Sequence, residues 1–271
     1  MINCEVITIK DPADPRIAAY RDIREADLVG RDGCFIAEGE VVLRVLLGAS
    51  RHRPISLLIA QKRIERLAPL LATAPPDTMI FSAGQAVLDA IVGFPIHRGV
   101  LALGRRAAAR TPDDLLAGLE AETLVLVLFG IGNHDNIGGL FRNAAAFGVG
   151  AVLLDAHCCD PLYRKAIRVS VGGALVTPFA RLAPGDDPIA LLRAHNLEPI
   201  ALTPRGAMRL IDLPRTRRTA LLLGAEGPGL DDALIERATA VSIPMSAGFD
   251  SLNVATTSGI ALHQLAFGYG R

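Results

Sequence analysis

The sequence is poor in lysine and carries no surplus of charge of either sign. Lys10, Lys62 and Lys165 are the only lysines among 271 residues, so arginine supplies nearly all of the positive charge. Basic and acidic side chains balance at 28 each, and nucleic-acid binding therefore cannot be argued from net charge. Arginine suits phosphate and carboxylate groups and stacks on bases, but composition alone is a weak functional signal.

Long apolar runs are also missing. The longest, residues 124–129, is far too short to span a bilayer, and the N-terminus lacks the apolar stretch of a signal peptide. The four cysteines, Cys4, Cys34, Cys158 and Cys159, show no CxxC spacing, and the vicinal pair cannot easily bridge to itself. Reduced thiols in a cytoplasmic protein without a membrane partner are the expectation.

Two common kinds of site fit poorly. Residues 157–160 contain His, Cys, Cys and Asp, but ligands so crowded along one segment cannot readily surround a metal, so no metal is predicted. The run 129–132 follows a strand as a dinucleotide-binding loop would, yet Asp135 stands where its third glycine should be and would repel a pyrophosphate. Asp155, at the end of the next strand, keeps a dinucleotide-binding dehydrogenase as an open alternative.

Alternating helix and strand patterns run through the chain and predict an α/β fold. Small and charged residues at 104–112 mark a seam, which gives a small α/β domain at 1–106, a linker at 107–118 and a second domain at 119–271. The second domain has expected strands at 123–129, 151–154, 175–179, 199–202, 220–223 and 240–243, and expected helices at 137–147, 162–171, 188–196, 231–237 and 252–267. Such alternation implies a parallel sheet covered on both faces, with ligands beyond the carboxyl ends of its strands.

Three blocks of small and polar residues follow apolar runs in this second domain. They are residues 136–144, residues 224–230, and residues 243–245 taken with 251–255. Glycine, proline and small polar residues at such positions allow the backbone to approach a ligand where larger side chains would collide. The blocks therefore predict one ligand site built from strand-end loops.

Jointly and in order, the blocks resemble the three motifs of the SpoU (TrmH-like) family of SPOUT RNA 2′-O-ribose methyltransferases. The resemblance spans residues 123–267 and includes the stretch 165–174. The front part is similar, at 35–39 and 92–94, to a ribosomal-protein-like RNA-binding domain that often precedes this catalytic domain. The resemblance implies a C-terminal parallel-sheet SPOUT domain with a trefoil knot, preceded by a small α/β RNA-binding domain, in a homodimer.

The family's reaction transfers a methyl group from S-adenosyl-L-methionine to the ribose 2′-OH of a nucleotide in rRNA or tRNA. By resemblance, the cofactor-binding residues are Leu223, Gly224, Gly227, Ile243, Met245, Ser251 and Leu252. The catalytic residues implied in the same way are Arg142, Asn136, Glu226, Ser251 and Asn253. The sequence departs from the family at Asn143, where Thr or Ser is common, and at 132–135, which lacks a frequent proline. Both departures bear on the target nucleotide more than on the reaction.

Arg142 is the main catalytic candidate. Family resemblance casts it in the deprotonation of the 2′-OH, but a guanidinium is practically never neutral in a protein. We therefore expect it to clamp a phosphate and stabilise the forming alkoxide, while the proton passes to phosphate or water. An ordinary surface ion pair is the competing interpretation.

The other candidates each have a purely structural alternative. Asn136 fits an N-cap for a helix starting at Ile137, Glu226 a solvated turn, and Ser251 the cap of the last helix. His134 is expected to be a loop residue without a catalytic role.

Two further alternatives concern the whole protein. A protein of this fold that holds RNA or S-adenosylmethionine without chemistry stays open, and a methyltransferase for a protein or small molecule is less favoured. Dimerisation is expected because relatives complete their active site across a subunit interface, and the apolar segment 252–267 offers a surface for it.

Overall fold

The chain folds around two separate sheets, in a computed structural model that describes residues 5–21, 33–92, 99–246 and 251–268. It divides into two compact units, one of Met1–Ala108 with Leu162–Val176 and one of Ala109–Pro161 with Thr177–Arg271. Gly93 and Phe94, part of the front-domain resemblance, lie outside the described residues. Within the described part of the chain, no helix is long and apolar enough to cross a membrane.

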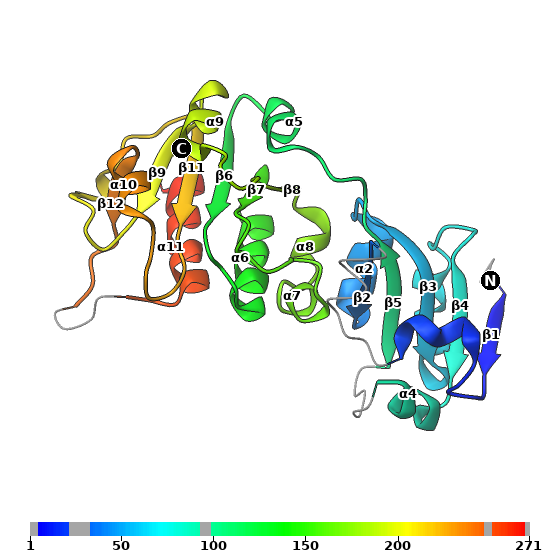
Figure 1. Cartoon of the computed structure of the whole chain (residues 1–271). Helices are drawn as coiled ribbons and strands as arrows, with labels where there is room; N and C mark the ends of the chain where they lie inside the picture. Colours follow the sequence, from blue (N-terminus) through cyan, green and yellow to red (C-terminus); the bar gives the residue numbers. More distant parts are fainter. Residues whose placement is uncertain (1–4, 22–32, 93–98, 247–250, 269–271) are drawn as a thin grey trace. The chain divides into compact units, whose positions relative to one another are not determined.

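The first unit holds a mixed sheet of five strands in the order β1-β4-β3-β5-β2 (Figure 1). Strands β1, β4 and β3 run parallel, whereas β5 is antiparallel to both β3 and β2. The strands are β1 Val6–Ile9, β2 Cys34–Glu38, β3 Arg53–Ala60, β4 Met79–Ala83 and β5 Val100–Arg105. The helices are η1 Pro15–Tyr20, α2 Glu40–Gly48, η2 Gln61–Arg63, α3 Ile64–Leu71, α4 Gln85–Val92, α7 Arg164–Val169 and α8 Gly173–Val176.

The second unit holds seven parallel strands in the order β10-β12-β9-β11-β6-β7-β8. The strands are β6 Thr123–Leu128, β7 Ala151–Leu154, β8 Phe179–Arg181, β9 Glu198–Leu202, β10 Met208–Arg209, β11 Arg218–Leu223 and β12 Thr239–Ser242. The helices are α5 Pro112–Ala117, α6 His134–Ala146, α9 Pro188–Ala194, η3 Leu210–Asp212, α10 Asp232–Glu236 and α11 Val254–Phe267. The parallel sheet expected from the sequence is thereby confirmed.

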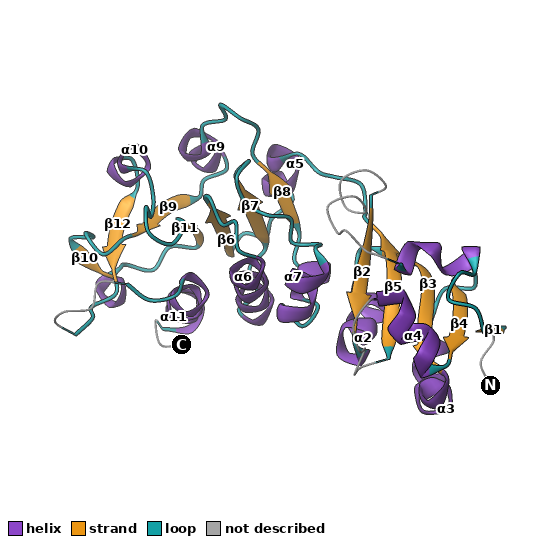
Figure 2. Cartoon of the chain, turned by 60° about the horizontal axis from the view of Figure 1, so that its bottom comes forward, coloured by secondary structure: helices purple, strands orange, loops and turns teal. Residues whose placement is uncertain are grey.

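Helices cover both faces of this parallel sheet. Figure 2 shows α5, α9 and α10 on one face and α6 and α11 on the other. Along β6, Val125 and Val127 join a core with Leu115 of α5 and Ile189 of α9, and the intervening Leu126 is fully buried as well. Successive strand side chains point to opposite faces, so a strand buried on both sides is apolar throughout. That is why polar and apolar residues do not alternate along β6.

Helix α6 begins at His134, earlier than the sequence suggested. The side chain of Asn133 caps it by accepting a hydrogen bond from the Asp135 N–H at 2.8 Å. The helix ends before Gly148, whose φ of 69° suits glycine. His134 is therefore a helical residue and not a loop residue, and Asn136 lies buried in the first turn and is not the cap.

The segment 162–176 differs from its expected helix and strand. Left-handed backbone at Val171 (φ 55°) and Gly172 (φ 88°) separates α7 from α8, and the next strand starts only at Phe179. A Cβ on Gly172 would lie 2.9 Å from the Cβ of Val45, so the break packs closely on α2. The sequence suggested a helix at 162–171 and a strand at 175–179, because this tertiary contact is invisible in it.

Candidate functional site

The three sequence blocks meet at one edge of the parallel sheet. The first block lies on α6, the helix that follows β6, and the other two blocks follow β11 and β12. The carboxyl ends of these three strands lie on the same side because all seven strands are parallel. Strand β9 ends at the same edge, between β12 and β11, and adds a fourth loop. Helix α6, which carries the first block, and α11, which begins within the third, lie side by side on one face of this sheet (Figure 2).

Asn253 joins all three blocks. Its Nδ2 donates to Asn136 Oδ1 at 2.9 Å and to Glu226 Oε1 at 2.8 Å. Its Oδ1 accepts from the N–H groups of Ala255 and Thr256, and so caps α11. Both functions of the amide group are therefore in use, and one side chain fixes the relative positions of segments more than one hundred residues apart.

The expected cap of the last helix was misassigned. Asn253, and not Ser251, is the N-cap of α11, which begins at Val254. Ser251 lies two residues earlier and lines the pocket described next. The sequence Ser-Leu-Asn offers two good capping residues, and only the path of the backbone decides between them.

A pocket of about 840 Å³ lies between the strand-end loops. Its walls include every residue expected to bind the cofactor: Leu223, Gly224, Gly227, Ile243, Met245, Ser251 and Leu252. Glu226 and Asn253 line it as well, which brings two of the expected catalytic residues to the same cavity. Asn136 is buried beside the pocket through its bond to Asn253.

The wall from Gly224 to Leu230 depends on glycine. A Cβ on Gly224 would lie 2.1 Å from the carbonyl carbon of Gly229, so no side chain fits there. Gly227 and Gly229 have φ values of 90° and 71°, in the left-handed region. The Gly229 N–H donates to the Ala225 carbonyl at 3.0 Å and closes the turn. The pocket is thus lined by backbone donors and acceptors that a ligand can reach closely.

Sequence reasoning missed the fourth loop of the pocket. Thr203, Pro204 and Arg205 follow β9 and line the cavity. Arg205 and Glu226 are the two charged residues among its described lining residues. The rule that placed the other blocks, polar residues directly after a strand, would have found Arg205 if applied to the strand at 199–202.

Arg142 stands apart from the pocket within one chain. It is exposed on α6, does not line the cavity, and forms no ion pair or hydrogen bond with another described residue. The ordinary ion pair considered from the sequence is therefore not seen within the described residues. The neighbouring Asn143 is engaged, because its Nδ2 donates to the Ala255 carbonyl at 2.6 Å and to Ser258 Oγ at 2.8 Å. That contact fastens α6 to α11.

Asp155 and Cys158 hold the loop between β6 and α6 in place. Asp155 Oδ2 accepts from the Gly130 N–H at 3.0 Å, and Cys158 Sγ accepts from the Ile131 N–H at 3.3 Å. Burial raises the pKa of the Cys158 thiol to about 12, so it stays protonated and donates to the Leu128 carbonyl. Asp155 is bonded into the protein at the position where a dinucleotide-binding site needs a free acid, which argues against that alternative.

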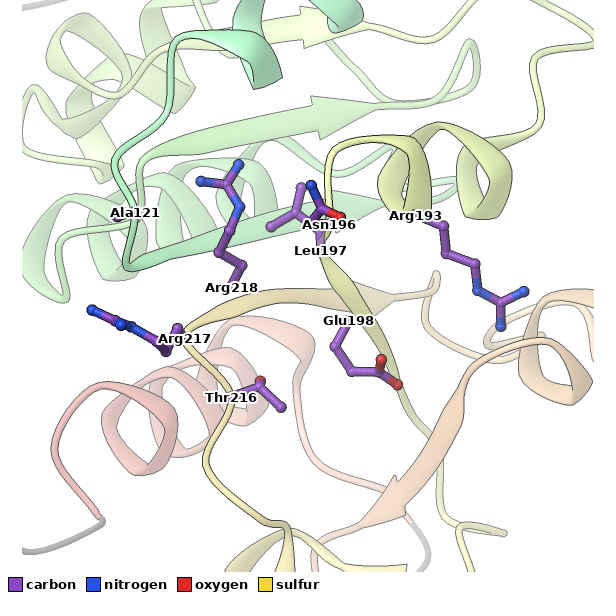
Figure 3. A pocket seen from close by; sticks show the side chains of 8 residues that line it. All are labelled: Ala121, Arg193, Asn196, Leu197, Glu198, Thr216, Arg217 and Arg218. Carbon is purple, nitrogen blue, oxygen red and sulfur yellow. The ribbon is translucent and has the colours of Figure 1, made fainter.

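A second cleft, of about 680 Å³, lies at the opposite edge of the sheet, by the amino ends of β6, β9 and β11 (Figure 3). Arg193 and Arg217 there point away from each other. Arg217 pairs with Glu122 at 3.0 Å, and Arg218 donates to the backbone carbonyls of Leu119 and Glu120. These arginines are already satisfied and do not converge, so the cleft lacks the geometry of a reaction site.

Known proteins resemble the chain over most of its length. The model of the SpoU rRNA Methylase family matches residues 123–263. An uncharacterized tRNA/rRNA methyltransferase of Mycobacterium tuberculosis is 40% identical over 270 residues, covering 96% of this chain and 91% of that protein. The 23S rRNA (guanosine-2′-O-)-methyltransferase RlmB of Escherichia coli is 30% identical over 205 residues, 74% of this chain and 84% of the relative. A crystal structure of an AdoMet-bound rRNA methyltransferase from Sinorhizobium meliloti superposes with a TM-score of 0.79 at 22% identity, covering 98% and 99% of the two chains.

Proposed function

The chain belongs to the SpoU rRNA methylase family, and we propose from this premise that it transfers a methyl group from S-adenosylmethionine to a ribose 2′-OH in rRNA or tRNA. The observation that carries the proposal is the Asn253 side chain, which bonds Asn136 and Glu226 at the wall of the 840 Å³ pocket. The names of the relatives, which include a guanosine-2′-O-methyltransferase, point to the same reaction.

The pocket fits S-adenosylmethionine by its chemistry. The closely packed backbone at Gly224 and Gly229 leaves amide and carbonyl groups to bond an adenine edge, and Leu223, Ile243 and Leu252 offer apolar cover for its faces. The cofactor supplies a methyl group on a positively charged sulfonium. Glu226 is the acidic residue among the described lining residues and can favour a cation there.

The protein's own groups hold and orient the reactants. Asn253 fixes the Glu226 carboxylate, while its bond to buried Asn136 ties that carboxylate to α6, the helix that carries Arg142. Arg142 grips the phosphate next to the target ribose and stabilises the developing alkoxide, and the proton leaves to phosphate or water. Holding the attacking hydroxyl in line at contact distance supplies the largest share of the rate enhancement.

The first unit is proposed to bind the RNA, as the domain at 1–106. Lys10 and Lys62, two of only three lysines in the chain, are exposed directly after β1 and β3. Strands β1 and β3 are both parallel to β4, so these lysines lie at one edge of the sheet. Cations at one edge give an electrostatic attraction to a phosphate backbone. An RNA acceptor also implies a cytoplasmic enzyme.

A homodimer completes the proposal. Helix α11 buries Ala261 and Leu262 within its own unit, but exposes 43% of Ile260 and 55% of Phe267. An apolar cleft of about 510 Å³ lies alongside Ile260, lined also by Phe147 and Ile211. A second copy would cover these groups, and it would bring Arg142 of one protomer to the pocket of its partner.

The trefoil knot of the family is also part of the proposal. The knot requires the chain after β12 to thread through a loop formed earlier, near the Gly224–Leu230 turn. Leu252, Asn253 and Val254 line the same pocket as that turn, which is compatible with such a path. Residues 247–250, on which part of the path depends, lie outside the described residues.

The test is transfer of labelled methyl groups from S-adenosylmethionine to RNA. We expect total RNA from a strain lacking this protein to accept label, and ribonuclease treatment beforehand to abolish the transfer. Label that survives ribonuclease would indicate a protein or small-molecule acceptor instead. Cofactor binding without any transfer would indicate the silent binding protein, and mapping the 2′-O-methyl groups lost in the deletion strain would identify the nucleotide.

A further inference from the structure

Arg205 is held at the rim of the pocket by a tight turn. The Thr203 N–H donates to the Val241 carbonyl at 2.9 Å, and the Gly206 N–H returns to the Thr203 carbonyl at 3.0 Å. The Arg205 N–H donates to Thr203 Oγ1 at 3.3 Å. These bonds anchor the turn to β12, so the base of the Arg205 side chain has one position relative to the pocket wall.

The absence of a side chain at Gly206 allows this turn to lie directly against the sheet. A Cβ at that position would lie 2.3 Å from the carbonyl carbon of Val241. Because the contact is with backbone, a side chain could be accommodated only by moving the turn. The glycine therefore brings Arg205 close to the carboxyl end of β12, whose next residue, Ile243, also lines the pocket.

The Arg205 guanidinium pairs with Asp232, which is not itself among the lining residues of the pocket. Asp232 is the first residue of α10, which follows directly after the glycine-rich wall. Both side chains are about two-thirds exposed, at 67% and 69%. An ion pair so exposed contributes little to stability, but it keeps a negative group beside Arg205, which lines the cavity.

The charges of the pocket are divided between its two sides. Glu226 is bonded to Asn253 on the side of α6 and α11. Arg205, with Asp232 beside it, stands on the side of β9 and α10. The methyl donor has a matching division, since its sulfonium carries one positive charge, and its amino-acid end carries a carboxylate and an ammonium group on the same α-carbon.

We propose that Arg205 and Asp232 bind the amino-acid end of the methyl donor, with the guanidinium on its carboxylate and the Asp232 carboxylate on its ammonium group. The inference rests on the proposed function. A planar guanidinium suits a carboxylate bidentately, and the pair presents its two charges in the complement of those on an amino acid. Arg205 and Asp232 are then affinity and specificity residues for the donor, and take no part in the methyl transfer itself.

The test compares two ligands that differ in this end group. S-adenosylhomocysteine carries the amino-acid end, whereas 5′-methylthioadenosine lacks it. By titration calorimetry, Arg205→Gln should weaken S-adenosylhomocysteine by about tenfold or more and change methylthioadenosine by less than about twofold, since one charge-assisted bond is lost in the first case only. Asp232→Asn should give the same pattern with a smaller loss.

The matched control is Arg209→Gln. Arg209 is also exposed and paired with an aspartate, Asp212, but it does not line the pocket. Both ligands should bind this variant as they bind the wild type. Thermal unfolding of each variant would verify that the fold is intact.

Equal losses for the two ligands in Arg205→Gln would overturn the proposal, because Arg205 would then support only the shape of the pocket. No loss for either ligand would overturn it too, as would a loss confined to RNA affinity, which would assign Arg205 to an RNA phosphate. Wild-type protein that binds neither ligand would refute the donor site itself. That outcome can be distinguished from a failure of the Arg205 proposal because the wild-type protein alone reveals it.

Discussion

Asn253 shows how one side chain can serve both the fold and the site. Its carbonyl oxygen caps α11, and its amino group holds Asn136 and Glu226 in place. Arg142 presents the opposite case, since it is exposed and forms no bond with another described residue. We therefore expect different effects when the two residues are replaced.

Replacing Asn253 distinguishes its role as the cap of α11 from its role as a bridge, the pair of hydrogen bonds to Asn136 and Glu226. Serine caps a helix about as well as asparagine but is too short to reach Asn136 and Glu226 together. Asn253→Ser should keep the free energy of unfolding within about 0.5 kcal/mol of the wild type, while Asn253→Ala loses about 1 kcal/mol. Methyl transfer should fall at least about tenfold in both. Urea unfolding and a labelled-methyl assay measure the two effects, and full activity in the serine variant would contradict the role of the bridge.

Replacing Arg142 by lysine keeps the charge and removes the planar fork. We expect methyl transfer to fall about a hundredfold or more, as when a donor to a developing oxyanion is removed. Binding of S-adenosylhomocysteine should be unchanged, because the proposed contacts of Arg142 are with the RNA phosphate and the 2′-oxygen and not with the cofactor. Single-turnover transfer and calorimetry test this, with Arg209→Lys as a control away from the site. Near-normal turnover in Arg142→Lys would remove Arg142 from the mechanism.

At the scale of elements, the pocket follows from parallel strands that end together. Strands β12, β9, β11 and β6 are neighbours in the sheet, so the loops after them come together although they are far apart in sequence. The glycine-rich turn after β11 is the most constrained of these loops, because Gly224 lies directly against Gly229.

The close approach of Gly224 to Gly229 leads to a prediction for Gly224→Ala. The added methyl group has no room beside the Gly229 carbonyl carbon, 2.1 Å away, so the turn must shift. We expect a loss of about 1–3 kcal/mol in stability, typical of overpacking, together with weaker binding of S-adenosylhomocysteine. Gly132→Ala is the control, because no atom lies within 4 Å of the Cβ it would add. Equal affinities in the two variants, measured by calorimetry, would argue against close backbone contact with the ligand.

At the scale of the whole molecule, we propose that the catalytic arginine and the pocket become one site when two copies associate. Helix α11 exposes Ile260 and Phe267 next to an apolar cleft, and α6, which carries Arg142, packs against α11. An apolar face of this kind is a common basis for a two-fold interface.

Ile260→Glu should convert a dimer into a monomer, since a charge buried in an apolar interface is strongly unfavourable. Gel filtration with light scattering would report the change, and methyl transfer should be lost with it. A wild-type monomer at assay concentrations would contradict the prediction. Mixing Arg142→Lys with Gly224→Ala offers an independent check, because only a site shared between protomers lets such a mixture regain activity.

The sequence by itself determined the local structure and the chemistry of the loops. Apolar periodicity gave the strands and helices of the second unit, and the order of the three blocks gave the family and the pocket residues. Both signals are local: a strand buried on two faces must be apolar, and a turn that approaches a ligand needs glycine. Such requirements remain readable in a short stretch of residues.

Only the tertiary structure decided which candidates meet. Four features depend on how distant segments pack together. They are the capping of α11 by Asn253, the burial of Asn136, the break at Val171 and Gly172, and the position of Arg205 at the pocket. Strand β9 lies between β12 and β11, an order that the succession of elements along the chain does not specify. Contacts between distant segments arise from burying apolar faces together, and that choice is made by the whole fold rather than by any one motif.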